Sequence, residues 1–191
     1  MFEVLISKKS KKLEDESKKA GFGKTFFIDG EKAVLIKTDR KEELRRQISS
    51  ASSKGKKIIV YGNNDDINRI SVEDKRVAIL LSPEFVRNKD FMHYPNSGLN
   101  QVLCKLAKKN GIAIGVSFSD IKSLKGKEKS ERLGRIMQNV DLCRKYKNEI
   151  VLASFGKKPS SPYALRSFGF LIGMTTDQLK ESLENAERAL S

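Results

Sequence analysis

The chain has 191 residues, with 38 Lys and Arg against 24 Asp and Glu, giving a net charge of +14 at pH 7. This length suits one domain with a good apolar core, and it is too short for a full (β/α)8 barrel with insertions. The charge favours a polyanionic partner, either nucleic acid or an acidic membrane surface, without indicating a fold. No apolar run approaches the roughly 20 residues that span a bilayer, and no leader pattern opens the sequence. We therefore expect a soluble, cytoplasmic protein without a membrane partner.

Apolar runs alternate with helical patterns along the whole chain, which predicts a single α/β domain over residues 1–191. The runs predict strands at 2–6, 25–28, 33–36, 58–61, 77–81, 112–118 and 150–153. The helical patterns lie at 13–20, 41–53, 65–70, 97–109, 128–146, 162–171 and 176–190. Such alternation favours a largely parallel sheet with right-handed crossovers, either doubly wound or closed into an incomplete barrel. Asp29-Gly30 leaves a hairpin open between the second and third runs.

The segment 96–121 has the clearest local signals. Ser97 stands where a helix N-cap belongs, and apolar residues recur behind it at helical spacing. Gly111 follows two lysines and suits a left-handed helix end. The run 112–118 is too continuously apolar to face water, as expected of a parallel strand covered on both sides.

Few residues could carry chemistry. His93 is the only histidine, and Cys104 and Cys143 lie in helical patterns without metal-type spacing. The segment 21–24 lacks the length of a phosphate-binding Walker loop, and its Gly-x-Gly precedes a predicted strand instead of opening a helix. Hence we find no self-contained active site, and we expect the chain to bind no metal or other cofactor.

Three blocks nevertheless resemble one known family. They are SGLN at 97–100 with the helix and strand behind it, RLGRIMQN at 132–139 with CRKY at 143–146, and SF at 154–155 with RSFG at 166–169 and LIGM at 171–174. In this order they are similar to the protein component 3 family of archaeal ribonuclease P. The resemblance implies a shortened or incomplete TIM-like barrel of about seven strands with helices outside.

The same resemblance implies a function and partners. The family is a non-catalytic protein cofactor of the catalytic RNA that removes the 5′ leader from precursor tRNA, a reaction that needs Mg²⁺. The implied partners are ribonuclease P RNA, protein component 2, with which the family forms a heterotetramer, and other holoenzyme subunits. Gln101 departs from the pattern, because many relatives have His there. The arginine expected just before Ser97 is also missing; if that arginine contacts RNA in relatives, this chain must compensate, and Arg87 and Lys89 are the candidates.

In a TIM-like barrel the loops after the strands gather on one face, and here three of these loops are basic. Each cluster taken alone suits a solvated surface, but together they predict a phosphate-binding face that recognises RNA backbone and shape rather than stacked bases. The predicted RNA-binding residues are Lys8, Lys9, Lys11, Lys12, Lys122, Lys125, Lys127, Lys129, Arg132, Arg135, Lys157, Lys158 and Arg166.

Arg132 and Arg135 lie three residues apart on a helix whose other face is apolar, so we expect both to point outward. The alternative is a surface pair bound to Glu128 or Glu131.

Two other functions remain open. One is a stand-alone, metal-dependent TIM-like phosphoesterase that uses His93 or a carboxylate. Related phosphoesterase barrels carry a His-x-His pair at the end of the first strand, where this chain has Ile6, Ser7 and Lys8. The other is a scaffold that only holds another subunit.

Overall fold

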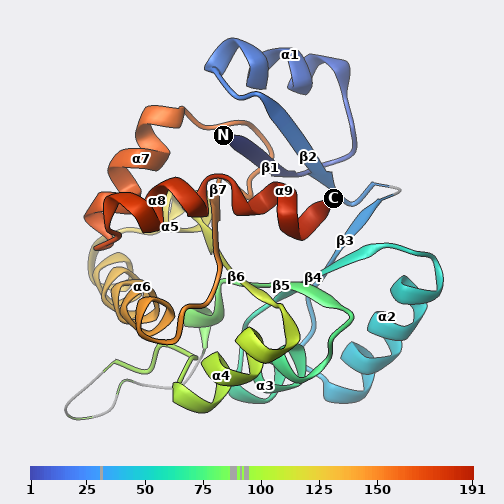
Figure 1. Cartoon of the computed structure of the whole chain (residues 1–191), viewed down its shortest axis with the longest axis vertical. Helices are drawn as coiled ribbons and strands as arrows, with labels where there is room; N and C mark the ends of the chain where they lie inside the picture. The colour runs from blue at the N-terminus through green and yellow to red at the C-terminus, as the bar shows by residue number, and fades with distance from the viewer. Residues whose placement is uncertain (31, 87–89, 91, 93–94) are drawn as a thin grey trace.

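The computed structural model describes residues 1–30, 32–86, 90, 92 and 95–191 (Figure 1). The expectations placed on Arg87, Lys89 and His93 therefore lie outside the described residues. The strands of the described chain are β1 (Phe2–Ile6), β2 (Lys24–Ile28), β3 (Ala33–Ile36), β4 (Lys57–Tyr61), β5 (Val77–Leu81), β6 (Ala113–Ser117) and β7 (Ile150–Ala153). The helices are α1 (Lys11–Ala20), α2 (Lys41–Ser53), α3 (Asp65–Glu73), the 3₁₀ turn η1 (Pro83–Phe85), α4 (Gln101–Asn110), α5 (Phe118–Ser123), α6 (Gly126–Tyr146), α7 (Pro162–Leu171), α8 (Thr176–Ser182) and α9 (Asn185–Leu190).

The strands form an incomplete parallel barrel. β3 to β7 make one five-stranded sheet in chain order, and β1 pairs with β2 in a second sheet. The two sheets meet where β1 runs beside the end of β7: Leu5 forms a parallel bridge with Gly156, and the Phe155 N–H donates to the Val4 carbonyl at 2.9 Å. The predicted α/β fold with an incomplete TIM-like barrel is confirmed.

The barrel is open between β2 and β3, which have no ladder between them. Both strands run in the same sense, yet only residues 29–32 connect them. Neighbouring parallel strands need a crossover of about a dozen residues or more, so this short link prevents them from pairing side by side. The hairpin interpretation of Asp29-Gly30 is wrong, and each strand keeps one unpaired edge.

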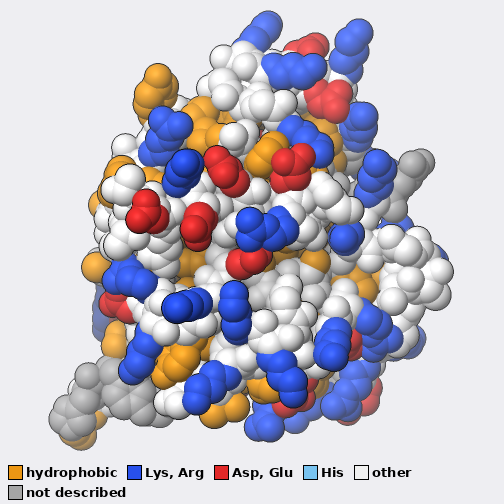
Figure 2. Space-filling model, in the orientation of Figure 1, with side chains coloured by type: hydrophobic (Ala, Val, Ile, Leu, Met, Phe, Trp, Pro, Cys, Tyr) orange, Lys and Arg blue, Asp and Glu red, His pale blue; other side chains and the backbone are white. Residues whose placement is uncertain are grey.

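Two apolar layers hold the fold. The inner layer fills the barrel with side chains such as Ile59, Ile79 and Val151, all fully buried, and Leu190 of α9 covers one end. The outer layer packs the helices on the sheet. α8 and α9 close the end where the strands begin, since the Phe2 N–H donates to the Leu183 carbonyl at 3.1 Å. Figure 2 views this end and shows acidic and basic side chains intermixed over it.

Several predicted element boundaries shift. The strand expected at 112–118 ends at Ser117, whose hydroxyl caps α5 by accepting from the Asp120 N–H at 3.2 Å. The helix expected at 97–109 begins at Gln101, with Asn100 as its cap. The last predicted helix divides into α8 and α9. Within the described residues, every helix is too short or too polar to traverse a bilayer.

Candidate nucleic-acid interface

The loop that follows β1, the start of α5 directly after β6, and the loop that follows β7 meet at the end of the barrel opposite α8 and α9. The Ile6 N–H donates to the Gly156 carbonyl at 2.9 Å, which joins the first loop to the third. The Ser119 N–H donates to the Ser154 carbonyl at 3.0 Å, which joins the second to the third. Gly156 permits this contact, because a Cβ there would lie 2.2 Å from the Ser119 hydroxyl. We call this surface the strand-end face.

A buried carboxylate, Glu3, ties the loop after β7 to β1. Its Oε1 accepts the N–H groups of Val4 and Ser154, both at 2.9 Å. Its Oε2 accepts the Ser154 hydroxyl at 2.5 Å and the Ser160 N–H at 3.0 Å. Burial raises the pKa of Glu3 above its usual range, although these hydrogen bonds favour the ionised form. Sequence reasoning missed this residue; a lone acid inside the apolar run 2–6 was the available signal.

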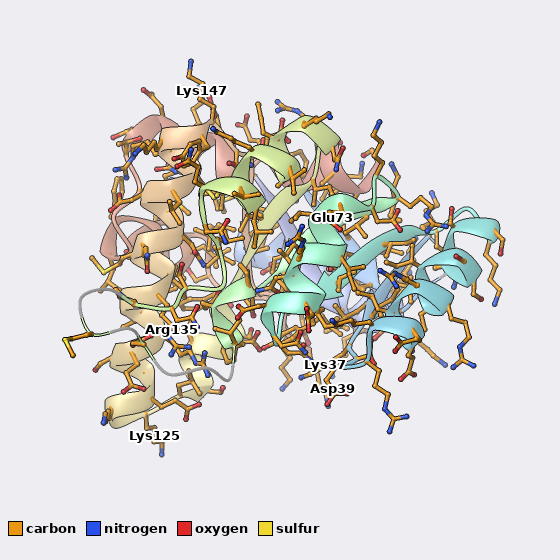
Figure 3. The ribbon with its side chains drawn as sticks, turned by 90° about the horizontal axis from the view of Figure 1, so that it is seen from below. Lys37, Asp39, Glu73, Lys125, Arg135 and Lys147 are labelled. Carbon is orange, nitrogen blue, oxygen red and sulfur yellow. The ribbon has the colours of Figure 1, made fainter. Side chains whose placement is uncertain are left out.

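The predicted lysines of these loops are mostly exposed. Lys129 is half-buried, whereas the others and Arg166 are exposed. In the described part of the chain, Lys9 pairs with Glu14 at 3.4 Å and Lys127 with Glu131 at 3.7 Å, and no ion pair involves the remaining lysines of the set. Surface pairs of this kind contribute little, so these charges remain available to a polyanion. Figure 3 shows Lys125 at the strand-end side of the molecule, with Lys147 at the opposite end.

Arg132 and Arg135 do not point outward together, and that prediction is wrong. Arg135 is 5 % exposed; its Nε lies 2.7 Å from Asp90 Oδ1, and its Nη1 donates to the Val86 carbonyl at 3.0 Å. Arg132 lies 4.6 Å over the Phe85 ring and donates to the carbonyls of Glu84 and Val86. The alternative pairing with Glu128 or Glu131 is not what holds them. Both arginines therefore hold the described residues that follow β5, through the backbone carbonyls of Glu84 and Val86.

Replacing Arg135 should therefore affect stability first. Arg135→Met is expected to lower the free energy of unfolding by about 1–3 kcal/mol, since Asp90 loses its ion-pair partner and the carbonyls of Glu84 and Val86 lose one of their two donors. Urea unfolding measures this, with the exposed Arg166→Met as the matched control, expected to change stability by less than about 0.5 kcal/mol. Wild-type stability in Arg135→Met, combined with weakened RNA binding, would instead make Arg135 a direct contact.

A polar cluster occupies the mouth of the barrel beside this face. Asp120 Oδ2 accepts the Tyr61 hydroxyl at 3.1 Å and the Ser82 hydroxyl at 3.3 Å, and Lys37 lies 4.3 Å over the Tyr61 ring. Glu84 is 1 % exposed, and burial raises its pKa to about 8, with the charge of Asp120 adding to the effect. Among the described residues, no three His, Cys, Asp or Glu side chains gather as a metal site.

The motif at 97–100 is an internal clasp. Gly98 has φ +73° and its carbonyl accepts from Asn68 Nδ2 at 3.1 Å, which also donates to the Pro83 carbonyl at 3.1 Å. Asn139 Nδ2 donates to the Ser97 carbonyl at 3.0 Å. The first two blocks singled out in the sequence thus meet through buried amides. These hydrogen bonds position the start of α4 against α3 and α6.

The chain is similar in sequence to a family of known proteins. A family model described as RNase P subunit p30 matches residues 32–191. Ribonuclease P protein component 3 of Methanosarcina mazei is 32% identical over 139 residues, which cover 70% of this chain and 54% of that protein. The protein of the same name from Methanocaldococcus jannaschii is 30% identical over 138 residues, covering 71% of this chain and 56% of its own length. The chain thus spans about half the length of these curated relatives.

A solved structure has a similar fold. A chain in the cryo-EM structure of archaeal Ribonuclease P with mature tRNA aligns with a TM-score of 0.80 at 21% sequence identity. The alignment covers 100% of this chain and 90% of the other. At this identity the likeness concerns the fold.

Proposed function

The chain belongs to the RNase P subunit p30 family, and from this premise we propose that it is a non-catalytic, RNA-binding protein subunit of ribonuclease P. In that role it supports removal of the 5′ leader from precursor tRNA, with catalysis by the RNA and with Mg²⁺ serving that RNA. The observation that carries the proposal is the meeting, on one face of a chain in this family, of the basic segments that follow β1, β6 and β7.

The geometry suggests how such a subunit would act. Exposed lysines on loops joined by Glu3 and by backbone hydrogen bonds present positive charge from fixed positions. Lysine contacts to phosphates release counterions and carry no sequence information, so they favour a folded RNA by its shape and charge density. The subunit would thereby stabilise a compact RNA whose phosphates would otherwise repel one another.

We also propose the partners that the family resemblance implies. Ribonuclease P RNA would occupy the strand-end face, and protein component 2 would join this chain in a heterotetramer within the holoenzyme. A chain of similar fold occurs in a solved archaeal ribonuclease P with mature tRNA, which supports a partnership with RNA. The cytoplasm is the compartment that fits this role.

A charge-removal series tests the RNA face. Lys122, Lys125 and Arg166 together replaced by Ala should weaken binding of ribonuclease P RNA at least about tenfold and make the slope of log affinity against log salt shallower by about two. Fluorescence anisotropy across a salt series measures both quantities.

The matched control removes three exposed lysines from the opposite end, Lys54, Lys75 and Lys180. This variant has the same net charge as the first and should retain affinity closer to that of wild type. Equal loss in the two variants would show that net charge, rather than the strand-end face, governs binding.

A further inference from the structure

The open side of the barrel contains a hollow of about 980 Å³. It lies between α1, β2 and the link to β3, and Leu190 and Ser191 border it, so the C-terminal residues lie beside β2 (Figure 1). Both Phe26 and Phe27 line it, although consecutive strand residues point to opposite faces. The hollow reaches both faces of β2 because the outer edge of that strand is unpaired.

Lysines surround this hollow. Lys8 and Lys9 come from the loop after β1, Lys18 from α1, Lys24 from β2 and Lys32 from the link to β3. Lys9 pairs with Glu14 and Lys24 with Glu187, the latter at 3.0 Å. Within the described residues no ion pair involves Lys8, Lys18 or Lys32, and all three are exposed. The rim is therefore cationic, with Asp29 and Glu14 as the acidic side chains among its described lining residues.

The two phenylalanines differ in their surroundings. Phe26 packs on the inner apolar layer and meets the Phe2 ring edge-on, with centroids 6.1 Å apart. Phe27 is also half-buried, but it belongs to neither apolar cluster of the described chain. An aromatic ring that is partly exposed, outside the core and in a hollow lined by lysines offers a stacking surface near phosphate-binding charges.

We propose that this hollow, which we call the edge groove, binds a single-stranded segment of RNA. The proposal rests on the proposed function and extends it, because Lys8 and Lys9 belong both to the strand-end face and to the groove rim. The RNA backbone would pass from that face around the open edge, with lysines on its phosphates and one base against Phe27. A duplex cannot present a base face in this way, since its bases are stacked on one another.

An extended acidic peptide is the competing occupant, since an unpaired strand edge can accept another strand. The groove favours RNA because its free lysines come from three separate elements, α1, the β1 loop and the β3 link, rather than from alternate positions along β2. A strand added to β2 would place its backbone on that edge and leave Phe27 without a stacking partner.

The test uses three probes: fluorescent oligouridylate of about 12 nucleotides, a blunt RNA duplex of similar length, and fluorescent polyglutamate. The variants are Lys18→Ala with Lys32→Ala, and Phe27→Leu alone. The control replaces Lys54 and Lys75 by Ala, and thermal unfolding verifies that every variant is folded. We expect both groove variants to bind oligouridylate at least about fivefold more weakly, with the control unchanged and with little change in duplex binding.

Oligouridylate binding that is equal in groove and control variants would overturn the proposal. So would polyglutamate that binds wild type more tightly than oligouridylate and loses affinity in the groove variants, which would make the groove a peptide site. The strand-end variant with ribonuclease P RNA separates the two ideas: if it loses affinity while the groove variants bind oligouridylate normally, only the groove assignment fails. If it also binds normally, the proposed function fails as well.

Discussion

Gly98→Ala is expected to destabilise the protein by more than about 3 kcal/mol, through backbone strain together with a forced backbone shift. The residue has φ +73°, and a Cβ there would lie 2.0 Å from the Pro83 carbonyl oxygen and 2.7 Å from Asn68 Nδ2. Neither neighbour can yield freely, because Asn68 Nδ2 also donates to the carbonyls of Pro83 and Gly98. Urea unfolding, read from the midpoint and slope, measures the loss.

Gly111→Ala is the matched control for this effect. Gly111 has nearly the same backbone angle, φ +70°, but a Cβ there meets nothing within 4 Å. Its replacement should cost only the conformational strain, about 1 kcal/mol. If the two variants lose equal stability, the close approach at Gly98 is not a structural requirement and the clasp is not rigid.

The free energy of unfolding of Glu84→Gln, measured relative to wild type, is expected to increase as pH rises. Burial raises the folded pKa of Glu84 to about 8 from an ordinary value of 4.5, so between these values the folded chain holds a proton that the unfolded chain has released. The stability that this proton confers is complete below about pH 4.5 and is lost as pH rises through 8. Each pKa unit of difference corresponds to about 1.4 kcal/mol, so the wild type should lose up to a few kcal/mol across this range.

Urea unfolding of both proteins between pH 5.5 and 8.5 follows this trend. Glutamine cannot ionise, so the difference in unfolding free energy between variant and wild type should move in favour of Glu84→Gln with rising pH. Glu3 shifts in the same direction and stays in both proteins, so it cancels in the comparison. A difference that does not change with pH would mean that Glu84 is already ionised in the folded protein.

The fold was largely predictable because its signals are local. Alternating apolar runs and helical patterns placed most strands and helices within a few residues, and Gly111 ended α4 in the left-handed conformation as predicted. The start of α4 was not predicted correctly, because Ser97, Gly98 and Asn100 offer competing signals for where a helix begins. The choice among them depends on Asn68 and Asn139, which lie on other helices and bond the carbonyls of Gly98 and Ser97.

The open side of the barrel was not predicted, because the pattern of apolar residues does not show whether β2 and β3 pair with each other. A short link with Asp29-Gly30 between two apolar runs is typical of a hairpin. Here β2 pairs with β1 and β3 pairs with β4, both in parallel, so the link joins strands that do not pair with each other. Sequence periodicity reports which residues are buried and does not report which strand is the neighbour.

The candidate site was also predictable only in part. The meeting of three basic loops followed from strand order, which places the ends of parallel strands together. Arg135 was expected to point outward because of its helical spacing, yet it is buried and bonds Val86 and Asp90, which follow β5. Spacing along a helix gives the direction of a side chain and does not reveal a loop that folds over it. Glu3 was missed for the opposite reason, since its partners Ser154 and Ser160 are distant in sequence.

Reconstituted cleavage of a precursor tRNA tests the central claim most directly. Ribonuclease P RNA and protein component 2 would be present throughout at moderate Mg²⁺, with wild-type chain, the strand-end variant, the matched control variant, or no chain. We predict 5′ cleavage that requires the RNA, rises with the wild-type chain and the control, and falls in the strand-end variant. Cleavage indifferent to the chain, or persisting when the RNA is omitted, would contradict it.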